Sequence, residues 1–294
     1  MFKKILFFAI LIIFLLTTFT FADDIDELPE DENLIEEVST EVSEEPKVYS
    51  RSAIVFDRNT KSILYEKDIN TKRAMASTTK IMTCIIILEN GNLNDTVKIS
   101  QKSANTGGSR LGLKKNDSIT VKDVLYGLML RSGNDAAVAL AEYMSGSIEE
   151  FANLMNEKAK TLGLTNTHFV TPHGLDDENH YTTAYELALL TDYALNNSTF
   201  SKIVNTKNYT ITINGYSKAL NNTNELLGYL NGVNGVKTGF TGNAGRCLVT
   251  SCVRNNFNII TIVLGADTKK IRTTDSIHLI EYAYNNFEQK NVKA

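Results

Sequence analysis

A chain of 294 residues, 43% of them hydrophobic, can bury one large core or two smaller ones. Its three cysteines are an odd number without metal-ligand spacing, and a chain of this size does not need disulfides to be stable. The formal net charge of −4 gives no reason to expect a nucleic acid as partner.

The first 22 residues have the features of a secretory signal peptide. Met1–Lys4 is a short positive start, residues 5–21 are almost wholly apolar, and the segment from Thr20 to Ala22 offers small residues for cleavage. The alternative is an uncleaved membrane anchor, because 17 apolar residues approach the length of a bilayer span. In both cases we expect the rest of the chain to be exported, to the cell wall or to the outer face of the cytoplasmic membrane.

Residues 23–46 form an acidic segment with 12 carboxylates and no basic side chain. Such a segment cannot bury enough apolar surface to offset its ordering entropy, so we expect a disordered tether. The remainder, residues 47–294, carries 22 acidic and 28 basic side chains, a net charge of +6. This mildly basic part should form the folded domain, and its charge suits an anionic polymer or a carboxylate-bearing substrate.

Local signals predict the elements in chain order. The runs 52–56 and 62–65 predict two strands joined by a turn, and residues 90–116 predict loops with short strands. Ser147 and Thr183 each precede a glutamate by three residues, which is the capping-box pattern that opens a helix. With the further start signals Thr120 and Asp135, the expected helices span 120–130, 136–144, 148–163 and 183–195.

The last third of the sequence returns to strands. Asn214-Gly215 suits a type I′ turn, so residues 209–220 predict a hairpin. Further strands are expected at 236–241, 247–253 and 257–264, and a helix at 276–287 closes the fold. Strands at both ends with helices between them predict an α/β protein of the α+β kind with one antiparallel sheet. The helix at 275–287 would cover one face of this sheet and the helical part, about 76–200, the other.

The cysteines fit this arrangement as core residues. Cys84 lies in an apolar run that predicts a helix, where a thiol packs as a small hydrophobic group. Cys247 and Cys252 are five residues apart on one expected strand. Because side chains alternate across a strand, these two should point to opposite faces of the sheet and should not pair.

The segment Ala76-Ser77-Thr78-Thr79-Lys80 leads directly into the apolar run 81–88 and predicts the first turn of a buried helix. At a spacing of three, the Ser77 hydroxyl and the Lys80 amine lie on one helical face, about 5–6 Å apart at Cβ. The helix N-terminus adds free N–H groups and a partial positive charge. An amine whose pKa is lowered can take the hydroxyl proton, so the pair is a candidate nucleophile and base. A serine cap one turn before a lysine is the plain alternative.

Two further motifs follow in the chain. Ser132-Gly133-Asn134 stands between two expected helices, and Lys237-Thr238-Gly239 is strand-like, with a glycine that lets a ligand backbone approach closely. Taken singly, each has a plain explanation as turn or strand-end material. Ser103-Ala104-Asn105 is a rival for the first, whereas Ser-x-x-Lys and Lys-Thr-Gly each occur once.

In this order the three motifs resemble the signature of penicillin-binding proteins and serine β-lactamases. The segments 131–137, 171–176 and 237–245 are together similar to the low-molecular-mass D-alanyl-D-alanine carboxypeptidases, and the likeness extends over about 50–287. It implies a β-lactamase/transpeptidase-like fold, with an antiparallel sheet covered by N- and C-terminal elements and a helical subdomain inserted. It also implies a serine-type carboxypeptidase that removes the terminal D-alanine from peptidoglycan stem peptides and is inhibited by β-lactams.

The resemblance assigns the catalytic roles by position. Ser77 would be the nucleophile, Lys80 its base, and Ser132 the relay of the proton towards the leaving D-alanine. Asn134 would orient Lys80 and the substrate amide. Lys237 would supply the positive potential that lowers the pKa of the base.

The resemblance likewise assigns the groups that bind the substrate. Thr238, followed by Gly239, would hydrogen-bond the terminal carboxylate of the peptide. The oxyanion hole would be formed by the backbone N–H groups of the nucleophile and of Phe240. Arg272 should help to hold the carboxylate, and Arg246 is the alternative.

No metal and no other cofactor is expected. His168, His173 and His180 fall close together, but no acidic ligand stands at a supporting spacing and the family uses no metal. His173 should instead order the loop that bears Thr171-Pro172. Many members carry a further β-rich domain and a C-terminal amphipathic membrane helix. Because this chain ends at Ala294, we expect any membrane contact to come through the N-terminal segment alone.

Two other functions share these residues. A β-lactamase would be acylated in the same way and deacylated fast, but Ser-Gly-Asn replaces the Ser-Asp-Asn of class A enzymes and no glutamate is positioned for the deacylating water. A wall-binding protein without turnover would keep the fold, but its site should have drifted. Endopeptidase activity on cross-links uses the same residues and stays open.

Overall fold

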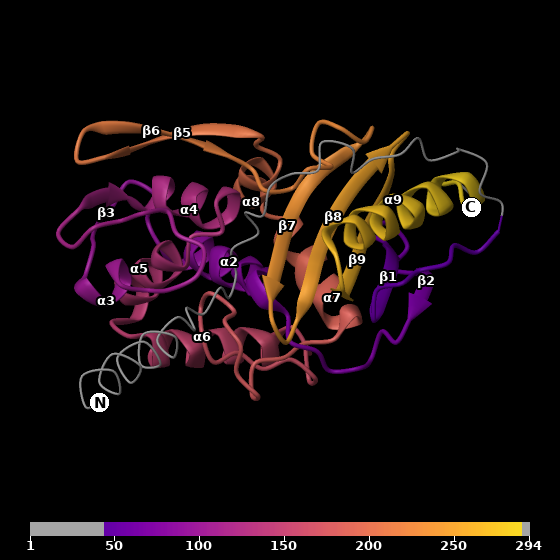
Figure 1. Ribbon diagram of the computed structural model, residues 1–294, viewed down its shortest axis with the longest axis horizontal. Coiled ribbons are helices and arrows are strands. Elements are labelled where there is room, and N and C mark those ends of the chain that lie inside the picture. The colour runs from indigo at the N-terminus through magenta and orange to yellow at the C-terminus, as the bar shows by residue number, and fades with distance from the viewer. Residues whose placement is uncertain (1–43, 290–294) are drawn as a thin grey trace, which may run out of the picture.

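The computed structural model describes residues 44–289 as an α+β protein in which a sheet stands beside a group of helices (Figure 1). The expected signal peptide and all but the end of the expected tether lie outside the described residues. At that end Glu44 and Glu45 are exposed, whereas Pro46 is already buried. Within 44–289, no helix is both long and apolar enough to cross a membrane.

The main sheet has five antiparallel strands in the order β2-β1-β9-β8-β7. The strands come from both ends of the described chain, as the sequence predicts, because β1 pairs along its whole length with β9. The central strands are buried on both faces, which explains their long apolar runs. Their bounds are Ser52–Asp57 for β1, Ile63–Lys67 for β2, Val233–Thr241 for β7, Gly245–Arg254 for β8 and Phe257–Ala266 for β9.

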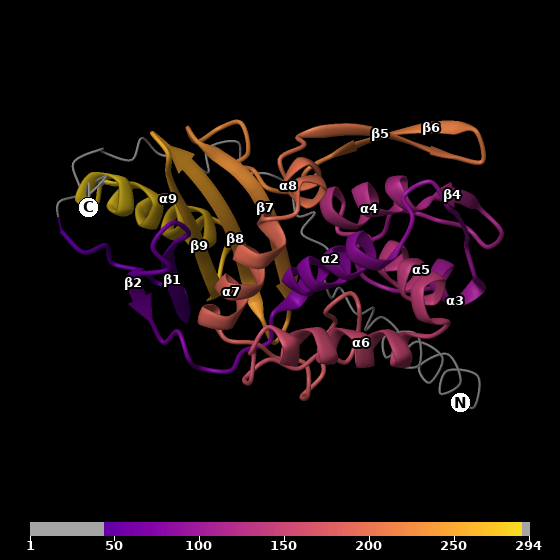
Figure 2. The same ribbon diagram turned by 180° about the vertical axis from the view of Figure 1, so that it is seen from behind.

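Helices cover both faces of this sheet. Helix α9 (Lys269–Asn286) packs on one face, and α7 (Ala184–Leu195) packs on the opposite face (Figures 1 and 2). Cys247 belongs to the core between the sheet and the helical group, whereas Cys252 belongs to the core under α9. The prediction that these two buried thiols point apart and stay unpaired is confirmed.

Helix α9 begins seven residues before the expected start at 276. Thr268 caps it, because its hydroxyl accepts the backbone N–H of Ile271 at 3.1 Å. The sequence prediction missed this start because the first turns of the helix are polar and the apolar residues of its buried face come later. Arg272 therefore lies in the first turns of a helix and not in a loop after β9.

Three of the four expected capping residues begin the expected helices, whereas Asp135 lies inside α5, which begins at Asn134 with Gly133 as its cap. Thr120, Ser147 and Thr183 each accept the backbone N–H three residues on. Two short helices, α3 and α8, were not predicted because neither is long enough to show an apolar stripe. The bounds before α7 are Ala76–Thr79 for the 3₁₀ helix η1, Lys80–Asn90 for α2, Gln101–Ala104 for α3, Val121–Leu130 for α4, Asn134–Ser145 for α5 and Ile148–Thr161 for α6; α8 spans Ser198–Val204.

The prediction of a single sheet is wrong. The hairpin of β5 (Asn208–Ile213) and β6 (Tyr216–Asn221) pairs with β3 (Thr96–Lys98) and β4 (Ser118–Thr120) in a second sheet of order β3-β4-β5-β6. Figure 1 shows this hairpin lying over α4, away from the main sheet. The Tyr209 ring stacks on Tyr126 of α4 with centroids 3.5 Å apart. Alternation predicts a hairpin but not which partner covers its apolar side.

Candidate active site

Ser77 lies where η1 meets the edge of the main sheet. Ala76 enters this turn with a φ of +47°, an uncommon conformation for a non-glycine residue. Ser77 follows it within η1 and is 1% exposed. Figure 1 shows α2 continuing from this turn beside β7. The sequence prediction of a helical turn that carries serine and lysine on one face is thus reproduced in the fold.

The Lys80 amine is held at three points. Its Nζ lies 2.5 Å from Ser77 Oγ, 2.7 Å from Asn134 Oδ1 and 2.9 Å from the carbonyl oxygen of His173. In its protonated form the amine can donate to all three oxygens, and in its neutral form it can accept the proton of the Ser77 hydroxyl. Lys80 is completely buried. The geometry therefore aims one buried amine at the hydroxyl that it would have to deprotonate.

Asn134 begins α5 with its side chain fixed from both ends. Its Oδ1 accepts from Lys80, and its Nδ2 donates to the carbonyl of Gly107 at 2.9 Å. The backbone N–H of Asn134 donates to Ser109 O at 2.7 Å. The contact with Lys80 fits the role that the resemblance assigns to Asn134. The other end of the amide binds the 107–109 loop, which the sequence gave no reason to expect.

Ser132 stands in the short connection between α4 and α5. It adopts a φ of +58°, and its buried hydroxyl has no hydrogen-bond partner among residues 44–289. The neighbouring Asp135 was predicted only as a helix start. Its carboxylate instead accepts the backbone N–H groups of the loop 111–113 at 2.7 to 3.0 Å. Asp135 therefore fixes the loop that surrounds the Ser132 connection.

Strand β7 brings the third motif to the nucleophile. Lys237 is 1% exposed and donates from Nζ to the carbonyl oxygen of Thr238 at 2.9 Å. A Cβ on Gly239 would lie 3.0 Å from the backbone nitrogen of Ser77. The glycine was expected to admit a ligand backbone. In the fold it also lets the strand lie against η1, so the peptide that carries the N–H of Phe240 adjoins the backbone of Ser77.

The close approach at Gly239 gives a testable prediction. In Gly239→Ala the added methyl must push the strand away from the backbone of Ser77, which spreads the two N–H groups assigned to the oxyanion hole. We expect acylation by penicillin to slow by roughly 10²-fold, the usual loss when one oxyanion donor is removed. Stopped-flow labelling measures this rate, and Gly215→Ala, in the exposed β5–β6 turn, is the control. A normal rate in Gly239→Ala would contradict this arrangement.

The two candidate carboxylate-binding arginines lie in different surroundings. Arg272 is completely buried and ion-paired with Glu225, whose Oε1 also accepts from Thr273 Oγ1 at 2.5 Å. The guanidinium of Arg246 lies over the ring of Phe240, 4.4 Å from the centroid. Glu225 was not singled out from the sequence, since a lone glutamate in a polar loop has no distinguishing pattern.

The loop from Val170 to His180 supports the nucleophile turn from the far side. Thr83 Oγ1 donates to Pro172 O at 2.6 Å, and the carbonyl of His173 accepts from Lys80. Gly174 has a φ of +90°, and a Cβ there would lie 2.0 Å from Ala76 O. Only glycine fits at this contact. The expectation that His173 orders this loop agrees with its Nδ1, which accepts the N–H of Leu175 at 3.2 Å.

His180 links the same loop to η1. Its Nδ1 accepts the backbone N–H of Val170 at 2.9 Å, so its Nε2 carries the proton and donates to Thr79 Oγ1 at 2.8 Å. Thr79 Oγ1 in turn donates to Ala76 O at 2.8 Å. This chain of hydrogen bonds requires a neutral imidazole. Burial lowers the pKa of His180 to about 4, and burial with the charge of Lys80 lowers the pKa of His173 to about 3.

These two pKa values predict how the free energy of unfolding depends on pH. The unfolded state binds a proton on each histidine below pH 6.5, whereas the folded state does not until about pH 4 or 3. Stability is therefore complete above pH 6.5 and falls with decreasing pH, by at most about 1.4 kcal/mol per pH unit for each histidine. Urea unfolding at several pH values between 4.5 and 7 gives the free energy of unfolding as a function of pH. This free energy should fall less steeply with decreasing pH for His180→Gln than for the unchanged chain, and equal slopes would contradict the prediction.

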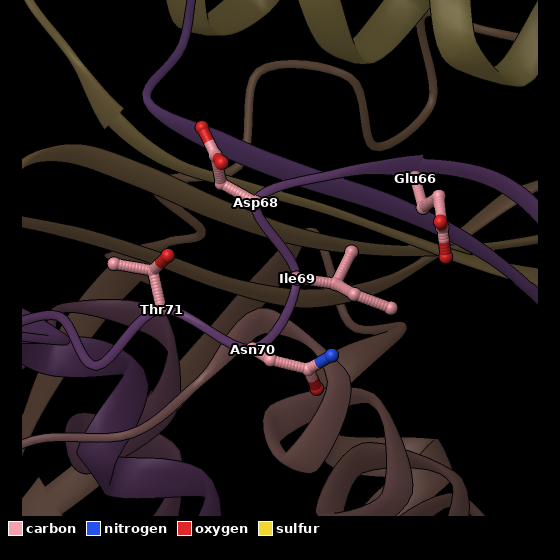
Figure 3. A pocket seen from close by; sticks show the side chains of 5 residues that line it. All are labelled: Glu66, Asp68, Ile69, Asn70 and Thr71. Atoms are coloured by element: carbon pink, nitrogen blue, oxygen red, sulfur yellow. The ribbon is translucent and has the colours of Figure 1, made fainter.

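One surface cavity lies apart from this cluster. Its volume is about 410 Å³, and Figure 3 shows the five residues that line it, at the end of strand β2 and just after it. None of these five is among the predicted site residues. They are Glu66, Asp68, Ile69, Asn70 and Thr71.

Comparison with known proteins gives consistent matches. The sequence model described as D-alanyl-D-alanine carboxypeptidase matches residues 39–268. The chain is 40% identical over 245 residues to D-alanyl-D-alanine carboxypeptidase DacF of Bacillus subtilis (strain 168), covering 81% of this chain and 63% of that protein. It is 37% identical over 257 residues to DacC of Escherichia coli (strain K12), covering 83% and 64%. The chain thus spans a little under two thirds of the length of these two relatives.

Solved structures give the same picture. The crystal structure of the Streptomyces K15 DD-transpeptidase superposes with a TM-score of 0.78 at 34% identity, covering 82% of this chain and 99% of that one. The D-alanyl-D-alanine carboxypeptidase DacD from Francisella tularensis superposes with a TM-score of 0.77 at 28% identity, covering 88% and 76%. The described residues therefore have the fold that the sequence motifs implied.

Proposed function

Because the chain belongs to the D-alanyl-D-alanine carboxypeptidase family, we propose that it is a serine-type carboxypeptidase that removes the terminal D-alanine from peptidoglycan stem peptides. The observation that carries this proposal is the buried amine of Lys80, 2.5 Å from Ser77 Oγ and fixed by Asn134. No imidazole is needed as a base where an amine has this position. The same site would be acylated by β-lactams, which place a carbonyl and a carboxylate at similar positions.

The first half of the reaction forms an acyl-enzyme. Ser77 Oγ attacks the carbonyl carbon of the penultimate D-alanine while Lys80 Nζ accepts the hydroxyl proton. The negative charge on the carbonyl oxygen is held by the N–H groups of Ser77 and Phe240. When the C–N bond breaks, Lys80 gives this proton to the leaving amine by way of Ser132 and is neutral again. The support for Ser132 is its buried hydroxyl, which is uncommitted among the described residues.

The second half returns the enzyme. A water molecule attacks the ester carbon, gives its proton to the Lys80 amine, and the Ser77–acyl bond breaks with return of a proton to Ser77 Oγ. The charge of Lys237 and the hydroxyl of Thr238 would hold the terminal carboxylate during acylation. Both residues belong to β7, the strand that packs against η1, and this placement supports a role for the strand in binding the carboxylate. Export through the N-terminal segment would bring the enzyme to its peptidoglycan substrate.

A β-lactamase is the alternative that the test must separate. The purified full chain is incubated with a fluorescent penicillin and followed by intact mass, and D-alanine release from diacetyl-Lys-D-Ala-D-Ala is measured in parallel. A long-lived adduct with D-alanine release is expected for a carboxypeptidase. A short-lived adduct with rapid penicillin hydrolysis and no D-alanine would replace the proposal by β-lactamase. No adduct would leave only a binding protein of the same fold.

A further inference from the structure

The segment Asn222–Glu225, between β6 and β7, touches three parts of the site at once. The backbone N–H of Thr223 donates to Leu130 O at 3.1 Å, just before the Ser132 connection. The hydroxyls of Thr223 and Thr238 lie 2.7 Å apart. Glu225 accepts from the Arg272 guanidinium and from Thr273. One short segment thus contacts Thr238 and Arg272, the two side chains that the resemblance assigns to the terminal carboxylate.

The spacing keeps these contacts together. Thr223 and Glu225 are two residues apart, so their Cα atoms are at most roughly 7 Å from each other. Thr223 contacts the hydroxyl of Thr238 and Glu225 contacts the charge of Arg272. The short backbone of this segment therefore limits the distance between the Thr238 hydroxyl and the Arg272 guanidinium.

The Glu225–Arg272 pair is tightly held. Arg272 is completely buried and Glu225 has a side-chain exposure of 23%. Burial by itself would raise the pKa of Glu225, but the charge of Arg272 and the hydroxyl of Thr273 hold this pKa below its ordinary value. A buried guanidinium needs such an anion, since an unpaired charge in this environment is strongly unfavourable.

We propose that Glu225 is a positioning residue for recognition of the substrate's terminal carboxylate. It fixes the buried guanidinium of Arg272 relative to the Thr238 hydroxyl, and so sets where these two groups can act on an entering carboxylate. Binding to a preorganised pair of donors avoids the cost of ordering them. This inference rests on the proposed function and on Arg272, rather than Arg246, as the carboxylate-holding arginine.

The ligand class that follows is a peptide with a free terminal α-carboxylate. The same peptide with a terminal amide has no charge to recognise and should gain nothing from a fixed Arg272. Comparison of the two peptides therefore isolates recognition of the carboxylate. A purely structural role of Glu225 would affect both substrates equally.

The experiment measures kcat and KM for diacetyl-Lys-D-Ala-D-Ala and for its terminal amide, with active sites counted by penicillin labelling. Glu225→Gln keeps the shape and removes the charge, and we expect KM for the acid to rise about tenfold, the worth of one charged hydrogen bond. Kinetics with the amide should stay unchanged. Glu281→Gln is the matched control, because Glu281 lies on the same helix α9 as Arg272 but pairs with Arg254 at the end of β8.

Action through Arg272 is tested by a double variant. Arg272→Gln should lower the preference for the acid, and adding Glu225→Gln to it should lower the preference no further. An unchanged or raised preference for the acid in Glu225→Gln would overturn the inference, and so would a further loss in the double variant. If Glu225→Gln does not fold, Glu225→Asp, with its shorter reach to Arg272, gives the same comparison. Failure of the unchanged chain to bind penicillin would instead refute the proposed function.

Discussion

Ser77→Ala should abolish covalent labelling by penicillin and release of D-alanine. The substitution removes only the oxygen that forms the ester, in a residue that is 1% exposed and whose turn is held by Thr78 and Thr79 side-chain bonds to the backbone. Intact mass after incubation with a fluorescent penicillin is the measurement. We expect no adduct and a loss of activity of at least about 10⁴-fold, in the range found when a nucleophile is removed.

The control is another serine with a structural role. Ser147 caps α6 by accepting the N–H of Glu150 at 3.0 Å and is not among the predicted site residues. Ser147→Ala should cost roughly 1 kcal/mol of stability and leave labelling unchanged. A penicillin adduct of normal yield on Ser77→Ala would show that a different residue is the nucleophile.

Lys80→Ala should slow acylation by roughly 10²- to 10⁴-fold, the usual contribution of a general base. The structure places this amine 2.5 Å from Ser77 Oγ. Burst kinetics with penicillin measure this step separately from hydrolysis of the ester. The loss should appear in the acylation rate and not in the final yield of adduct.

Lys80→Arg separates the base from the charge. A guanidinium keeps the positive charge but does not lose its proton in proteins, so it cannot accept one from Ser77. We expect this variant to be as slow as Lys80→Ala. An acylation rate near normal in Lys80→Arg would mean that the charge matters and that another group takes the proton. Both variants remove the amine that donates to the buried acceptors Asn134 Oδ1 and His173 O, so either could lose stability. Melting temperatures of both variants are therefore measured to exclude unfolding as the cause of slow acylation.

Several elements could be predicted because their causes are local. The caps at Thr120, Ser147 and Thr183 act on a backbone N–H three residues away, and each began its helix as expected. The second half of one capping box did not form. Glu186 binds Asn166 N at 2.8 Å and Thr167 Oγ1 at 2.6 Å, so it ties α7 to the preceding loop. A carboxylate has several possible partners, and only the packed chain decides among them.

The surroundings of Arg272 could not be predicted from the sequence. Its position three residues into α9 depends on the cap at Thr268, and its partner Glu225 is 47 residues away. No sequence pattern around either residue predicts that the two form an ion pair. The same holds for Asp135, whose carboxylate binds backbone N–H groups of the loop 111–113, and main-chain donors leave no trace in residue identity.

The sequence by itself predicted the chemistry proposed for this protein. The spacing of Ser77 and Lys80 on one helical turn, and the order of the three motifs, indicated a candidate nucleophile, a candidate base and a strand beside them. Helical spacing fixes such neighbours through bonded geometry alone. Tertiary structure decided that the third acceptor of Lys80 is the carbonyl of His173, that Gly239 lies against Ser77, and that the 209–220 hairpin joins a second sheet. These contacts join distant segments largely through backbone atoms, which every residue carries, so only the packing of the whole chain selects them.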